Sequence, residues 1–127
     1  MAIRAELTLR LPNTPGALRE FCDTLTGGHV NLLALHLDSS GRVRCVVDNP
    51  LLAADVLRRQ HHEVESREVL YVTVPNAPGA LAGTARLLHE VGVNVQYAYA
   101  AVVEGTTLAA VVFGVDDAQR ASALSGL

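Results

Sequence analysis

The 127-residue sequence has few aromatic residues and no excess of positive charge. Phe, Trp and Tyr together make up 4% of it, and ten Lys and Arg residues stand against 13 Asp and Glu, which gives a net charge of -3. Proteins that bind nucleic acid need a basic surface for the phosphates, and many use aromatic rings on which bases stack. The composition therefore predicts a protein that does not bind nucleic acid.

A long hydrophobic run is also missing. Arg4, Glu6 and Arg10 interrupt the N-terminal segment, so it lacks the apolar core of a signal peptide. No stretch is long and apolar enough to cross a bilayer. The two cysteines, Cys22 and Cys45, fall where we expect helix core and strand core, and a free cysteine there behaves as a small hydrophobic residue. We expect a cytoplasmic protein without membrane contacts.

What the sequence does contain is an internal repeat. Residues 12–18 read PNTPGAL and residues 75–81 read PNAPGAL, an offset of 63 residues. Val30-Asn31 returns at the same offset as Val93-Asn94. This self-similarity indicates a tandem duplication. Each half has about 60 residues, a size that folds only marginally alone, so we expect the halves to share an interface.

The pattern of apolar residues predicts the same order of elements in both halves. Residues 3–11 alternate between apolar and polar side chains, as in a strand with one buried face. Thr14 is expected to cap a helix whose first residue is Pro15, and Gly27-Gly28 to end it. The remaining elements that we expect are strands near 30–38 and 42–48 joined by a hairpin turn, a helix from Pro50 capped by Asn49, an extended stretch at 63–74, a helix from Pro78 to about Val91, strands at 93–104 and 107–115, and a short helix after Asp117.

Each half thus consists of a strand, a helix, two strands and a helix, and a final strand is evident only in the first half. This order predicts an α+β fold of two ferredoxin-like (βαββαβ) modules, at residues 1–69 and 70–127, with antiparallel sheets and helices on one face. The second module ends where its last strand should begin, and proteins usually protect an open sheet edge. Together with a hydrophobic content of 50% and a mean hydropathy of +0.26, this favours a homodimer.

The repeated turn offers backbone groups to a ligand. Gly16 and Gly79 leave the main chain uncovered beside the first amides of a helix, and a helix N-terminus with free amides binds anions such as a carboxylate. Asn13 and Asn76 in the same turn each carry donors and an acceptor, which suits either charged group of an amino acid. A purely structural interpretation is also complete, because proline, glycine and asparagine are typical turn residues.

Asn31 and Asn94 stand at the start of the following strand in each half. Asparagine is depleted in strands, yet this one recurs at the same register in both halves. A residue with a purely structural role there could more easily be apolar. The recurrence therefore favours a binding site over a simple turn.

The chain resembles a stand-alone tandem pair of ACT domains, the small-molecule-sensing modules found on enzymes of amino-acid metabolism. The resemblance spans nearly the whole chain, and its most specific parts are Asn-x-Pro-Gly-x-Leu at 13–18 and 76–81 and Val-Asn at 30–31 and 93–94. In that family, the turn and the strand asparagine contact an amino-acid effector at the interface between two adjacent modules. The resemblance implies this ligand-binding role for Asn13, Gly16, Ala17, Leu18, Asn31, Asn76, Gly79, Ala80, Leu81 and Asn94.

The function that this resemblance implies is a non-catalytic sensor that binds an amino acid between ACT-like modules and regulates amino-acid metabolism. Two alternatives stay open: an assembly or regulatory adaptor for a partner enzyme with no ligand of its own, and a small ferredoxin-like enzyme. The sequence contains no nucleophile motif, phosphate loop or Cys-x-x-Cys, so we expect neither catalysis nor a cofactor.

Two further clusters have a functional and a structural interpretation. His61-His62 with Glu63 and Glu65 has metal-binding residue types, but adjacent histidines point in divergent directions, so we expect no metal site. Tyr97 and Tyr99 share one face of a strand, where they could pack across the sheet or form a wall for the effector side chain.

Overall fold

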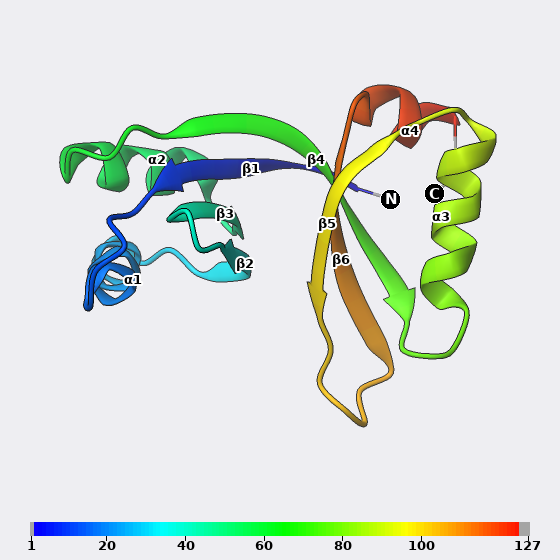
Figure 1. Cartoon of the computed structure of the whole chain (residues 1–127), viewed down its shortest axis with the longest axis horizontal. Helices are drawn as coiled ribbons and strands as arrows, with labels where there is room; N and C mark the ends of the chain where they lie inside the picture. The colour runs from blue at the N-terminus through cyan, green and yellow to red at the C-terminus, as the bar shows by residue number, and fades with distance from the viewer. Residues whose placement is uncertain (1, 125–127) are drawn as a thin grey trace. The chain divides into compact units, whose positions relative to one another are not determined.

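The computed structural model describes residues 2–124 of the chain, which form two compact units (Figure 1). The first unit comprises residues 5–67. The second unit comprises residues 2–4 and 68–124. Two long strands, at residues 2–10 and 65–75, thus each contribute residues to both units.

The first unit contains most of β1 (Ala2–Arg10), α1 (Ala17–Gly27), β2 (Leu32–Leu37), β3 (Arg42–Val47), α2 (Pro50–Arg59) and the start of β4 (Glu65–Pro75). Its strands follow the order β2-β3-β1, and both pairings are antiparallel. Leu7 and Leu9 of β1 pack with Phe21 of α1 and Leu57 of α2 in one buried cluster, so both helices cover the same face of the sheet. This is the predicted ferredoxin-like arrangement.

The second unit repeats this arrangement with the rest of β4, α3 (Ala80–Glu90), β5 (Val95–Ala101), β6 (Leu108–Val115) and α4 (Ala118–Leu124) (Figure 1). Its strands follow the order β4-β6-β5, again antiparallel. Leu88 of α3 and Ala121 of α4 pack in one cluster with Phe113 of β6. The α+β class and the antiparallel sheets are therefore as predicted.

The expected gap beside the first strand of the second unit is filled by the start of the chain. β1 is the neighbour of β4 in the strand order, and residues 2–4 belong to the second unit. Ile3 packs against the core of this unit, and the guanidinium of Arg4 lies 5.0 Å from the centre of the Tyr71 ring. The first residues of β1 therefore lie where the final strand of the second unit was expected.

The helix start predicted at Thr14 and Pro15 is wrong. α1 begins at Ala17, its N-cap is Gly16 in the left-handed conformation (φ 88°, ψ -11°), and no side chain caps it. The amide of Ala17 donates to the Thr14 carbonyl (3.3 Å), which closes a turn with Pro15 and Gly16 at its centre. A proline followed by a residue of positive φ is the signature of a type II turn, so Pro15 belongs to the turn and not to the helix.

The same correction applies to the second copy. α3 begins at Ala80 and not at Pro78, Gly79 has φ 85° and ψ -8°, and the Ala80 amide donates to the Ala77 carbonyl (3.3 Å). The repeated Pro-Gly therefore encodes one backbone shape twice. By contrast, the start of α2 is as predicted, because Pro50 is its first residue and the Asn49 side chain accepts a hydrogen bond from the Leu52 amide (3.2 Å).

Two other features of the first unit concern its polar groups. The predicted hairpin turn is present, and the Asp38 carboxylate accepts hydrogen bonds from the amides of Ser40 and Arg42; the Ser40 hydroxyl also holds the pKa of this carboxyl below its usual value. Glu6, expected on the polar face of β1, is fully buried, with Arg44 Nη1 4.0 Å from its carboxylate.

Within residues 2–124, no helix is long and apolar enough to cross a membrane.

Candidate functional site

The first copy of the turn presents free backbone amides next to an exposed asparagine. The amide of Glu20 donates to the Gly16 carbonyl (3.0 Å). The amides of Leu18 and Arg19 donate no hydrogen bond to any described residue. Asn13 is exposed, and among residues 2–124 nothing is hydrogen-bonded to its side chain. Ala17 is buried in the core and anchors the turn. The turn therefore combines one buried residue, Ala17, with backbone amides that donate to no described residue.

The second copy has the same backbone but a different asparagine contact. The amide of Gly83 donates to the Gly79 carbonyl (3.0 Å), and the amides of Leu81 and Ala82 find no acceptor in the described part of the chain. The side chain of Asn76, however, donates from Nδ2 to the Thr106 carbonyl (2.9 Å). This bond ties the turn to the β5–β6 hairpin, so the two copies are not equivalent at the asparagine.

The asparagines at the two strand starts are held through their backbone. Asn31 donates its amide to Asp48 Oδ1 (3.0 Å), and the amide of Asp48 donates to the Asn31 carbonyl (3.1 Å). Asn94 and Asp116 repeat the pair at 3.1 and 3.2 Å. The side-chain amides of both asparagines are exposed and have no hydrogen bond to the described residues. The fold therefore fixes these two positions while their side chains stay free for a ligand.

Asp48 and Asp116, which hold the backbone of these asparagines, were not singled out from the sequence. They are 68 residues apart, whereas Asn31 and Asn94 are 63 apart, so the connection between the asparagine and its aspartate is five residues longer in the second half (68 - 63). An ungapped comparison at an offset of 63 pairs Asp48 with Val111 and conceals the match. The signal that could have revealed it is an aspartate that directly follows the second strand of each hairpin and precedes a helix.

The turn and the strand asparagine of the same unit do not come together. The end of β1 lies beside the start of β3, because Arg10 pairs with Arg42, whereas the start of β2 lies beside its end, because Leu32 pairs with Val47. At about 3.3 Å per residue, the two ends of β3 are roughly 17 Å apart. In the second unit, β6 separates the turn from Asn94 by roughly 23 Å on the same basis. A site that uses both features therefore needs two modules.

Two grooves in the first unit lie away from these residues. One of about 410 Å³ is lined by Thr8, Leu9, Arg10, Arg42, His61, His62, Glu63 and Glu65. A wider one of about 820 Å³ is lined by Pro12, Glu20, Asp23, Thr24, Gly27, Gly28, Val56, Arg59, Gln60 and His62. Neither lining includes any of the ten residues that the family resemblance selected.

The comparison with known proteins identifies the family. A family model described as the ACT domain pair matches residues 1–125. The chain belongs to the ACT domain pair family. Among curated proteins, none matches this chain.

Solved structures resemble this ACT domain pair over most of its length. Protein BT0572 from Bacteroides thetaiotaomicron is 28% identical with a TM-score of 0.87, over 96% of this chain and 85% of that one. The ligand-free regulatory subunit of aspartate kinase from Thermus thermophilus is 16% identical with a TM-score of 0.71, over 98% and 92%. Aspartokinase III of E. coli, solved with lysine and aspartate, is 18% identical with a TM-score of 0.58, over 99% of this chain but 32% of that one. These likenesses place the chain among folds that include regulatory subunits.

The tyrosines of the second ACT module have a packing role. Tyr97 pairs with Gly114 across β5 and β6, and a Cβ at Gly114 would lie 2.1 Å from its ring. The Tyr97 and Tyr99 rings are nearly parallel, at 10°, with centres 6.5 Å apart. Both face away from the helices, because their partners Gly114 and Val112 alternate along β6 with the core residue Phe113. Tyr97 thus packs over the backbone of Gly114, which is buried.

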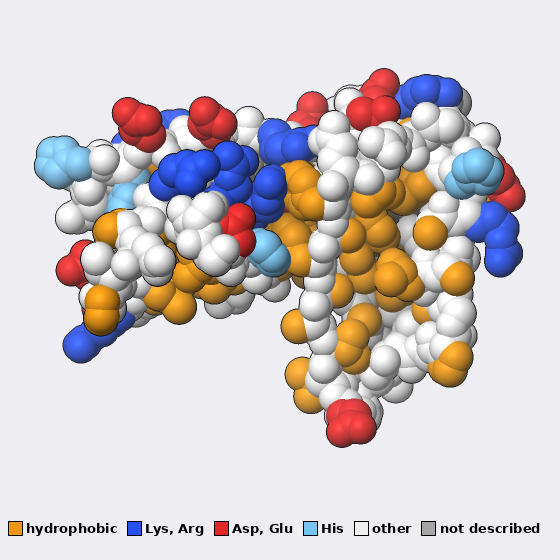
Figure 2. Space-filling view, in the orientation of Figure 1, with side chains coloured by type: hydrophobic (Ala, Val, Ile, Leu, Met, Phe, Trp, Pro, Cys, Tyr) orange, Lys and Arg blue, Asp and Glu red, His pale blue; other side chains and the backbone are white. Residues whose placement is uncertain are grey.

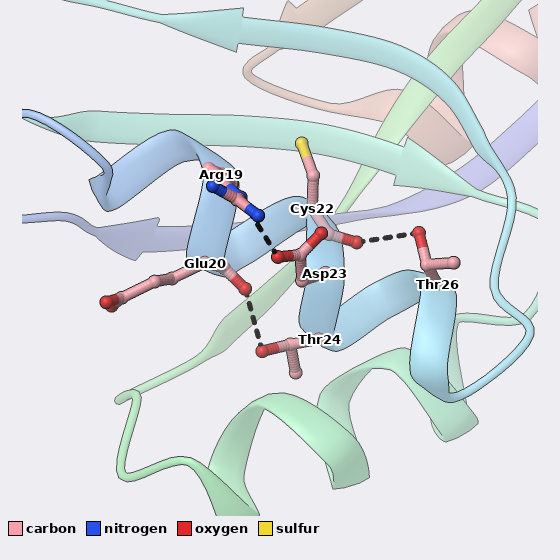
Figure 3. A network of polar contacts seen from close by, with 6 residues as sticks. All are labelled: Arg19, Glu20, Cys22, Asp23, Thr24 and Thr26. Carbon is pink, nitrogen blue, oxygen red and sulfur yellow. Dashed lines mark hydrogen bonds and ion pairs between the residues drawn. The ribbon is translucent and has the colours of Figure 1, made fainter.

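The two cysteines lie in different surroundings, one buried and one on a helix. Burial, and then the nearby Glu6 charge, raise the pKa of the Cys45 thiol to about 12, so it stays protonated at neutral pH. Cys22 lies on α1, where the Thr26 hydroxyl donates to its carbonyl (2.9 Å) and the Arg19 guanidinium lies 3.6 Å from Asp23 (Figure 3). In the described part of the chain, no three His, Cys, Asp or Glu residues cluster as metal ligands, His61 and His62 included.

Proposed function

We propose that this ACT domain pair is a non-catalytic sensor that binds an amino acid at an interface between ACT modules and regulates amino-acid metabolism. The observation that carries the proposal is the state of Asn31 and Asn94. Asp48 and Asp116 hold their backbone, and their side-chain amides are exposed without a partner among the described residues. Asn49, by contrast, uses its side chain within the fold to cap a helix.

The proposed site joins the turn of one module to the strand start of another. The turn supplies the free amides of the first helical residues for the carboxylate of the ligand, and the helix dipole favours a negative charge there. The strand asparagine supplies an amide that can accept a bond from the ammonium group. The proposed contacts are those ten residues: Asn13, Gly16, Ala17, Leu18, Asn31, Asn76, Gly79, Ala80, Leu81 and Asn94.

The similar structures support a regulatory role. The Thermus thermophilus protein is a regulatory subunit of aspartate kinase, and the E. coli aspartokinase III structure contains lysine and aspartate. We propose that the present chain likewise acts on a partner enzyme in the cytoplasm, as a homodimer. The exposed leucines of the edge strand β2, which are Leu33, Leu35 and Leu37, support self-association because an apolar sheet edge is rarely left open.

The test is thermal melting of the full chain against each of the twenty amino acids. A ligand at about 100 times its dissociation constant stabilises the folded state by about 2.7 kcal/mol, which should raise the melting point of so small a protein by several degrees. We expect at least one amino acid to produce this shift. If none does at millimolar concentration, the sensor proposal fails and the adaptor without a ligand takes its place.

Two asparagine variants separate the site from the scaffold. Asn31→Ala with Asn94→Ala should abolish the ligand shift and leave the melting point without ligand unchanged, because these side chains hold nothing within the described fold. Asn49→Ala, a matched control at a helix cap, should lower the melting point by removing about 1 kcal/mol of stability but should keep the ligand shift. The reverse pattern would assign Asn31 and Asn94 to the scaffold.

A further inference from the structure

The groove of about 410 Å³ lies wholly within the first unit, at the end of its sheet. Three segments form it: the last residues of β1, the first residue of β3, and the segment after α2, where His61, His62, Glu63 and Glu65, the first residue of β4, line the groove. None of them belongs to the repeated turn or to the strand starts. Binding pockets for small molecules occupy about 300–1,000 Å³, so this groove has the capacity for a ligand of amino-acid size.

Two arginines stand side by side on one wall of the groove. Arg10 and Arg42 are directly opposite each other in the β1–β3 ladder. Like charges in this position destabilise a sheet unless an anion lies between them. Arg10 Nη1 donates to the Ser40 carbonyl (3.3 Å), and no carboxylate of the described residues pairs with either guanidinium. The pair is therefore available to a carboxylate, which guanidinium groups bind in two-pronged geometry.

Two acidic residues, Glu63 and Glu65, line the same groove. Figure 2 shows basic and acidic side chains next to one another over the strands of the first unit. Within residues 2–124, however, neither glutamate forms an ion pair with Arg10 or Arg42, and the arginines of the first unit that do form pairs use other acids, such as Arg59 with Asp55 at 2.8 Å. Two arginines and two glutamates thus line one groove without forming ion pairs with each other.

We propose that this groove is a separate binding site for a zwitterion of the amino-acid class. The ligand carboxylate lies between Arg10 and Arg42, and its ammonium group faces Glu63 and Glu65. A ligand with charges of both signs matches both walls, whereas phosphate or a divalent cation matches one wall and is repelled by the other. His62 lines this groove and the wider one between the helices, so it marks their common wall.

The experiment is a titration of the full chain, labelled with ¹⁵N, with each of the twenty amino acids and separately with inorganic phosphate and Mg²⁺. We expect an amino acid to move the backbone amide signals of Arg10, Arg42 and residues 61–65, and phosphate and Mg²⁺ to leave them in place. Arg10→Gln with Arg42→Gln should weaken this binding by at least about tenfold, because a hydrogen bond to a charged group contributes about 1.5–3 kcal/mol. Arg19→Gln, which removes the same charge from an exposed face of α1, should change nothing at the groove.

The outcome is independent of the site proposed at the asparagines. Asn31→Ala with Asn94→Ala should leave the groove signals responsive, and the arginine variant should leave the signals of residues 31 and 94 responsive. If the arginine variant does not fold, Glu63→Gln with Glu65→Gln provides the same test from the other wall. The groove proposal is wrong if no amino acid moves its signals, if phosphate moves them equally, or if a folded groove variant binds as tightly as the unchanged chain.

Discussion

Glycine-to-alanine substitutions four residues apart test the turn on which the proposed site depends. Gly79 has φ 85° at the N-cap of α3, and Gly83 lies inside that helix. A Cβ at either position meets no atom within 4 Å, so neither substitution creates a clash. The two alanines therefore differ in backbone conformation and not in packing.

The expected effects have opposite signs. Gly83→Ala should stabilise the protein by about 1 kcal/mol, because alanine is the better helix former. Gly79→Ala should destabilise it, since an L-residue in the left-handed region costs about 1–2 kcal/mol. Both substitutions reduce the freedom of the unfolded chain equally, so that contribution cancels when the variants are compared. The two variants should differ by about 2–3 kcal/mol, which is on the order of 10 °C in melting point for a protein of this size.

Urea unfolding followed by circular dichroism, with the melting point as a second measure, checks this order. Gly16→Ala, in the first copy of the turn at φ 88° and also free of contacts, should behave like Gly79→Ala. Equal stability of Gly79→Ala and Gly83→Ala would refute the type II turn, and with it the placement of the free amides of the following helix.

Two other predictions concern packing and a buried thiol. Gly114→Ala should cost about 1–3 kcal/mol because its Cβ meets the Tyr97 ring, and this cost should vanish in a Tyr97→Ala background, as a double-mutant cycle of unfolding free energies would show. Cys45, whose pKa burial raises from 9.0 to about 12, should resist alkylation at pH 8 in the folded protein while the half-buried Cys22 reacts first, measured by mass spectrometry. Because the pKa of Cys45 is higher in the folded than in the unfolded state, its contribution to stability is complete below pH 9 and is lost as the pH rises toward 12.

The sequence predicted the order of elements because each one carries a local signal. The strand β1 and the Asn49-Pro50 start of α2 depend on neighbouring residues, and both are found where expected, although Glu6 on the polar side of β1 is buried. The Pro-Gly turn misled the prediction because proline is common both at the first position of a helix and in the second position of a turn. Only the positive φ of the next residue distinguishes these cases, and glycine permits it without requiring it.

The remaining features depend on contacts between distant parts of the chain. The hydrogen bonds between Asp48 and Asn31 span 17 residues. Residues 2–4 lie beside β4, so the start of the chain is next to a strand more than 60 residues away in sequence. No periodicity within one segment encodes such neighbours, which is why the sequence alone did not reveal them.

The separation of the turn and the asparagine within one module has a thermodynamic consequence for the proposed sensor. The two groups lie at opposite ends of β3 in the first unit and of β6 in the second, so one module cannot hold a ligand with both. A ligand that is bound by both groups therefore binds the associated modules more tightly than the separated ones. Linkage makes this effect reciprocal. The free energy by which association strengthens ligand binding equals the free energy by which the bound ligand stabilises the association. Under the proposed function, the concentration of an amino acid would therefore set the degree of assembly of the modules, and a partner enzyme would respond to that assembly without containing the site itself.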